Sequence, residues 1–135
     1  MKLIASLRIP IKTVSEANSS EHWTKKHKRH KAQKLAVGLY FRGDVSKAVL
    51  QAGLPLHIVI TRIAPRELDE GDNLPMSVKP IRDYLAALIK PGLQIGRADG
   101  TSDFAFDVTQ EKGKPKEYAV RIEFYNMQHS VSKHV

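Results

Sequence analysis

A short polar stretch between residues 69 and 73 groups the side chains best suited to chemistry. It reads Asp69-Glu70-Gly71-Asp72-Asn73, with three carboxylates in four residues. Carboxylates packed this closely repel one another, and a bound divalent cation removes that repulsion. Because Mg²⁺ prefers carboxylate oxygens and water as ligands, the stretch is a candidate magnesium site, with Mn²⁺ as an alternative ion. The competing interpretation is a solvated acidic turn, which is a common feature of proteins.

Lys79 and Asp83 follow on a segment whose apolar spacing predicts a helix. If that helix begins after Asp72, the residues Asp72, Lys79 and Asp83 stand at about 0°, −20° and +20° around its axis, on one face. A lysine beside carboxylates can hold a phosphate or stabilise charge that develops in a transition state. A surface ion pair between Lys79 and Asp83, worth a few tenths of a kcal/mol, explains the spacing equally well.

A further acid, Asp99, lies in a predicted loop, with Asp103 as its nearest competitor. A loop that leads to a sheet edge can bring Asp99 back against Asp72. Spacing alone does not establish that contact, so it does not decide which residue supplies the third carboxylate of the site.

Positive charge gathers in another part of the chain. The net charge is +8, which attracts polyanions, and nucleic acid is the commonest polyanion in a cytosol. Six Lys or Arg residues within ten positions, almost unbalanced by acid, form what we call the basic cluster: Lys25, Lys26, Lys28, Arg29, Lys31 and Lys34. We expect these side chains to contact DNA phosphates rather than to form only a solvated helix face. Trp23, just before the cluster, is expected in the core or at an interface rather than as a platform for stacked bases.

The elements that must position these residues follow from hydrophobic periodicity and from Gly and Pro. Strands are predicted at 2–11, 54–63, 103–110 and 118–125, and helices at 21–41, 44–52 and 74–90. The last two strands are expected to form a hairpin. The order β-α-β-α-β-β, with the short helix 44–52 as an addition, predicts an α/β or α+β fold in which helices pack against a small mixed sheet of about four strands. Pro80 requires the third helix either to begin near Ser77 or to kink.

The domain plan is simple. We expect one domain over residues 1–126 and a polar tail at 127–135. No segment approaches the roughly 18 apolar residues that a membrane span needs, so no membrane partner and a cytoplasmic location are expected. The chain has no cysteine, which excludes disulfides and thiolate metal sites.

Four motifs follow one another in an order that resembles a known family. They are the turn LDEGDNL at 68–74, Lys79 on the next helix, Arg82-Asp83 one helical turn later, and GRAD at 96–99. This order is similar to the signature of the RusA family of Holliday-junction resolvases, and Gln110 resembles its phage-type members. The similarity covers roughly residues 3 to 125.

The resemblance implies specific roles. Asp72 matches the second acid of the family's turn and Asp99 the second Asp of its later Asp-Asp pair, both metal-binding and catalytic. Lys79 resembles the family's essential lysine, and Asn73 and Asp83 are supporting residues. Such enzymes are bacterial or phage-encoded homodimers that cut four-way DNA junctions symmetrically with Mg²⁺.

The sequence departs from the family pattern at three points. The turn usually reads Asp-x-Asp-Asn, whereas here either Glu70 or Asp69, with one extra residue, takes the first ligand position. Ala98 replaces one member of the Asp-Asp pair. Lys79 also lies three residues further from Asp72 than in the best-known resolvases.

The leading hypothesis is therefore a Mg²⁺-dependent endonuclease that resolves Holliday junctions or branched DNA in recombination and repair. Asp72, Asp99 and one of Asp69 and Glu70 would hold the metal ion, and the basic cluster would grip the DNA backbone. The alternative is a DNA-binding protein of the same fold that has lost cleavage activity. We consider it because Ala98 replaces one aspartate of the family's Asp-Asp pair. An RNA-binding module is less favoured, because no RNA-binding signature is present.

Overall fold

Alternating and helical apolar patterns in the sequence correspond to seven elements in the structure. The computed structural model describes residues 2–15, 22–91 and 103–126. In chain order the elements are β1 (Lys2–Ile9), α1 (Trp23–Tyr40), α2 (Asp44–Ala52), β2 (Leu56–Ala64), α3 (Asn73–Ile89), β3 (Phe104–Lys112) and β4 (Ala119–Asn126). The predicted class of fold is confirmed, because the described chain forms one mixed four-stranded sheet with helices packed against it.

The sheet is built around its most apolar strand. Its order is β1-β4-β2-β3, with β2 parallel to β3 and antiparallel to β4, while β1 runs antiparallel to β4. On β2, Leu56, Ile58 and Ile60 are fully buried. A strand with neighbours on both sides has its backbone groups paired on both edges, so this apolar strand gains most from a central position.

The predicted hairpin between the last two strands is wrong. Both strands form, but β2 lies between β3 and β4. Helix α3 carries the chain from β2 back to a parallel position beside it, which gives β3 the outer place. The connection 113–118 then crosses over β2, a span of about 10 Å that six extended residues cover easily.

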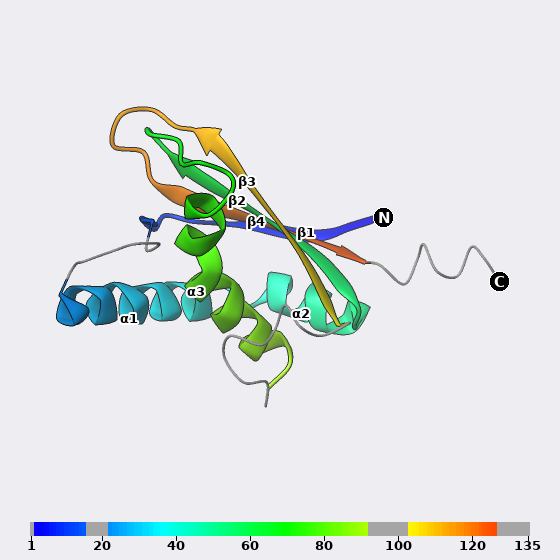
Figure 1. Cartoon of the computed structure of the whole chain (residues 1–135). Helices are drawn as coiled ribbons and strands as arrows, with labels where there is room; N and C mark the ends of the chain where they lie inside the picture. The colour runs from blue at the N-terminus through cyan, green and yellow to red at the C-terminus, as the bar shows by residue number, and fades with distance from the viewer. Residues whose placement is uncertain (1, 16–21, 92–102, 127–135) are drawn as a thin grey trace.

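The hydrophobic core lies between the sheet and the helices. Figure 1 shows the three helices on one side of the sheet, and the core residues Val37 of α1, Val49 of α2 and Ile81 of α3 are all fully buried. They pack with sheet residues such as Ile58 and Phe124. In the described ranges, no helix combines the length and apolar character needed to cross a membrane.

Helix α3 contains Pro80 in its interior. The helix begins at Asn73, so of the two arrangements that the sequence allowed, a start near Ser77 is wrong. Proline at position 80 cannot donate a hydrogen bond to the carbonyl of Met76 and crowds it, which bends a helix. Figure 1 shows α3 changing direction along its length.

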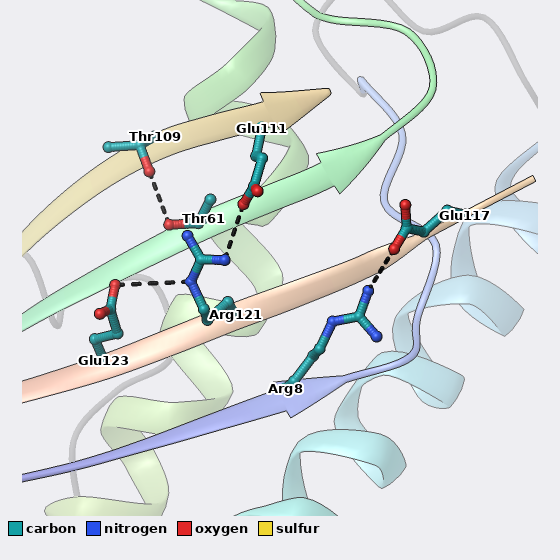
Figure 2. A network of polar contacts seen from close by, with 7 residues as sticks. All are labelled: Arg8, Thr61, Thr109, Glu111, Glu117, Arg121 and Glu123. Atoms are coloured by element: carbon teal, nitrogen blue, oxygen red, sulfur yellow. Dashed lines mark hydrogen bonds and ion pairs between the residues drawn. The ribbon is translucent and has the colours of Figure 1, made fainter. Parts of the chain in front are cut away.

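The other face of the sheet is polar. Arg8 on β1 pairs with Glu117 at 2.9 Å, and Arg121 on β4 pairs with Glu111 at 2.8 Å and with Glu123 at 3.9 Å. Figure 2 shows these side chains in front of the strands, with the helices behind. The arginines of this face therefore have carboxylate partners.

Candidate functional site

The chain that enters the acidic turn is held in place by two strands of the sheet. Arg62 of β2 donates from Nη1 to the carbonyl oxygen of Arg66 at 2.9 Å. Gln110 of β3 donates from Nε2 to the carbonyl of Leu68 at 2.7 Å, and its Oε1 accepts from the Leu68 amide at 2.9 Å. Arg62 and Gln110 lie opposite each other in the parallel register. The position of the turn relative to the sheet is thus fixed by bonds from both strands.

Within the turn, Asp69 acts as an internal acceptor. Its Oδ2 accepts from the backbone amides of Asp72 at 3.1 Å and Asn73 at 3.5 Å, and its Oδ1 accepts from the side-chain amide of Asn73. Ser15 donates in turn to Oδ1 of Asn73. The hydrogen bond from the Asn73 side chain, followed by that from the Asp72 amide, lowers the pKa of the Asp69 carboxyl. Asp69 and Asn73 therefore shape the turn, which is the role of a supporting residue.

Glu70 and Asp72 are the two remaining carboxylates of the turn. Both are exposed, and neither makes a hydrogen bond or ion pair through its side chain within the described part of the chain. Asp72 is the N-cap residue of α3, yet its side chain makes no capping bond. Two exposed carboxylates separated by one glycine suit Mg²⁺, which is commonly bound by one or two carboxylates together with water.

The predicted third carboxylate cannot be compared with these two. Asp99 and its neighbour Ala98 lie outside the described residues. Among residues 2–15, 22–91 and 103–126, no group of three or more His, Asp or Glu side chains is arranged to hold a metal ion. The predicted ligand set is thus described for Asp69, Glu70 and Asp72 only.

Lys79 and Asp83 form the ion pair that their spacing predicted. Lys79 Nζ lies 3.5 Å from Asp83 Oδ2, but the Asp83 side chain is only 6 % exposed, so this is not the solvated surface pair of the competing interpretation. Asp83 Oδ1 is buried and has no hydrogen-bond partner in the described structure. Both residues line a pocket of about 250 Å³ between α1 and α3, together with Lys26 and His30.

The basic cluster lies along the first two-thirds of α1. Five of its six members are exposed and Arg29 is half-buried. Lys26 borders the pocket that contains Lys79, and Lys34 Nζ lies 5.9 Å from the centre of the Tyr84 ring on α3. The cluster therefore runs beside α3, the helix that begins at the acidic turn.

No model of a known protein family matches the chain, and a search of curated proteins finds no match either. Membership of the resolvase family accordingly stays a prediction that rests on the motifs of the sequence.

Trp23 is not a core residue. Its side chain is 71 % exposed at the start of α1, next to the rings of His22 and His27, so the expectation of a core position is wrong. As the first residue of the helix it has no turn before it to pack against.

Sequence reasoning missed the part played by Arg62. It is 6 % exposed and lies on the same side of the sheet as the core residue Ile60. The available signal was a single charged residue in an otherwise apolar strand. Gln110 was noticed only through the family resemblance, and its two bonds to Leu68 now give a physical reason for an amide at that position.

Proposed function

We propose that the chain is a Mg²⁺-dependent endonuclease that acts as a homodimer on branched DNA, including four-way junctions. The observation that carries the proposal is the acidic turn, in which Asp69 is used to hold the loop while Glu70 and Asp72 stay exposed. A turn stabilised in this way presents two carboxylates without needing a bound ion to form. Pre-organised ligands of this kind are what a catalytic metal site requires.

Each nearby group has a role in this scheme. Glu70 and Asp72, with Asp99, would hold the ion, which when bound supplies an activated water and stabilises the negative charge of the reacting phosphate. Lys79 is one-third exposed and carries a positive charge that can contact a phosphate beside the turn. The basic cluster would hold the flanking DNA backbone, because each lysine or arginine that meets a phosphate releases bound counterions.

The homodimer follows from the symmetry of the substrate. A four-way junction that is cut symmetrically needs two active sites related by a two-fold axis, and a dimer with this symmetry is the commonest protein solution. A chain of 135 residues has one acidic turn of this kind, so two copies are needed.

The test is cleavage of a synthetic four-way junction by the full chain with Mg²⁺ or Mn²⁺. Asp72→Asn should abolish cleavage and leave unfolding unchanged, because the Asp72 side chain makes no capping bond. Asp44→Asn is the matched control, since Asp44 is an exposed acid at the start of α2 and should be dispensable.

A wild-type protein that binds junctions but never cleaves them with either ion would contradict the enzyme proposal. That result would favour the alternative, a DNA-binding protein of this fold without cleavage activity.

A further inference from the structure

Arg62 is a buried cation without a carboxylate partner in the described structure. Its three hydrogen bonds go to neutral oxygens: Oγ1 of Thr13 at 3.0 Å, the carbonyl of Thr13 at 3.5 Å and the carbonyl of Arg66 at 2.9 Å. A guanidinium has five N–H donors, so two remain without an acceptor among the described residues. Burial lowers the pKa of Arg62, yet a guanidinium stays charged in proteins. The positive charge is therefore present, and no carboxylate in residues 2–15, 22–91 and 103–126 compensates it.

The arginines on the opposite face of the sheet make the contrast clear. Arg8 and Arg121 have side chains 52 % and 40 % exposed, and both nevertheless pair with glutamates, as Figure 2 shows. Exposed arginines gain little from such pairs, whereas a buried charge needs a counter-charge most. The most buried of these three arginines is the one that has no anionic partner among the described residues.

A cavity of about 450 Å³ opens beside Arg62. Its other polar side chains come from Lys12, Thr13, Ser15, Arg66 and Tyr118, and no carboxylate is among its described lining. The ammonium group of Lys12 lies 4.8 Å from the centre of the Tyr118 ring. Three cations and three hydroxyl groups around one cavity match a phosphate, which offers several acceptor oxygens to the planar donors of arginine.

The cavity adjoins the acidic turn. Leu68, which lines it, directly precedes Asp69 in the chain, and Arg66, which also lines it, lies three residues before Asp69. Ser15, another lining residue, donates a hydrogen bond to Asn73 within the turn. A phosphate in the cavity would thus lie next to the carboxylates proposed to act on DNA.

We propose that this cavity, the Arg62 pocket, binds a phosphodiester of the DNA backbone next to the one that is cleaved. The choice of DNA as the source of the phosphate rests on the proposed function, whereas the presence of an anion site does not. Arg62 would contact the phosphate from the floor of the pocket, and Lys12 and Arg66 from its exposed rim. The pocket would then fix the register of the strand against Glu70 and Asp72.

The experiment observes Arg62 directly by its side-chain Nε–H signal in ¹H–¹⁵N NMR spectra, with metal removed by EDTA so that no cleavage takes place. Inorganic phosphate and a short single-stranded oligodeoxynucleotide are titrated separately. The pocket variant is Lys12→Gln/Arg66→Gln, which changes two exposed side chains and keeps the buried bonds of Arg62. The control is Arg42→Gln/Lys47→Gln, which removes the same charge from exposed positions outside the pocket.

In the wild type and the control, the oligonucleotide should shift the Arg62 signal in a saturable way, and in the pocket variant the shift should be lost. The slope of log affinity against log salt for single-stranded DNA should also fall by about 0.7 more in the pocket variant than in the control, which corresponds to one phosphate contact. If the oligonucleotide does not shift the Arg62 signal, the proposal is overturned, even if inorganic phosphate shifts it. Equal behaviour of the two double variants overturns it as well. Neither measurement needs cleavage, so the two proposals can fail separately. A protein that does not cleave DNA but whose Arg62 signal shifts with the oligonucleotide would refute only the endonuclease proposal. A protein that cleaves DNA but whose Arg62 signal does not shift would refute only the pocket proposal.

Discussion

Gln110 provides the sharpest test of how the acidic turn is held. Replacement by Met keeps the length and volume of the side chain but removes both hydrogen bonds to Leu68. A typical hydrogen bond contributes about 1 kcal/mol net, so the loss of two should lower the free energy of unfolding by about 2 kcal/mol. For a chain of this size that corresponds to a fall in Tm of roughly 6 to 10 °C.

Urea unfolding followed by circular dichroism measures the change in stability, and amide hydrogen exchange at Leu68 locates it. Gln51→Met is the control, because Gln51 is exposed on α2 and makes no hydrogen bond within the described structure. At a temperature where both variants are folded, junction cleavage by Gln110→Met should fall roughly tenfold to a hundredfold, since small displacements of catalytic groups have effects of that order. The reasoning is refuted if the two variants unfold within about 0.5 kcal/mol of each other, or if exchange at Leu68 is unchanged.

Four further predictions concern the other parts of the site. Glu70→Gln should abolish cleavage and leave the free energy of unfolding unchanged, whereas Asp69→Asn should lower the free energy of unfolding. Equal and mild effects of the two variants on the cleavage rate would mean that neither acid is a primary metal ligand. The folded state lowers the pKa of the Asp69 carboxyl from its ordinary 3.8, so the stability that this carboxylate contributes is complete above pH 3.8 and is lost as the pH falls below that value. In this acid range the free energy of unfolding of the wild type should therefore fall more steeply with decreasing pH than that of Asp69→Asn. Lys79→Met should lower the free energy of unfolding, measured in urea, by about 1 to 2 kcal/mol, which is less than for a fully buried pair because the Lys79 side chain is 33 % exposed. Adding Asp83→Asn should recover part of that loss, and strictly additive effects of the two substitutions would contradict the ion pair. Changing the first four residues of the basic cluster to Gln should weaken binding to every DNA shape and reduce the salt slope by about 0.9 for each lost contact to duplex phosphate, and an unchanged slope would exclude the cluster from the interface.

The local elements of the fold could be predicted from the sequence because their causes are local. The bounds expected for α2, 44–52, agree with the structure, where Gly53 ends the helix with a positive φ of 75°. The partnership of the strands could not be predicted in the same way. The turn after Glu111 has the composition of a hairpin loop, and only the burial of β2 between its neighbours decides that the loop crosses over a strand.

The same division applies to the candidate site. The grouping of acids at 69–73 was visible in the sequence, but their separate roles were not. Asp69 differs from Glu70 only because the backbone of the turn points two amides and the Asn73 side chain at it. The Arg62 pocket combines β2 with the segment after β1, residues about fifty positions apart, so no local pattern indicates it.

The place of β4 in the sheet has a consequence for how the protein is made. β4 is the last strand of the sheet to leave the ribosome, and it is the partner of both β1 and β2. Lys2 at the beginning of β1 pairs with Asn126 at the end of β4, so β1 cannot join the sheet until β4 has been synthesised. Until then the nascent chain can complete only the β2–α3–β3 unit, and β1 stays an unpaired strand with apolar side chains that nascent-chain chaperones and proteases recognise. A product that stops before Ala119 would therefore lose β1 from the sheet together with β4, and we expect such fragments to be degraded rather than to accumulate.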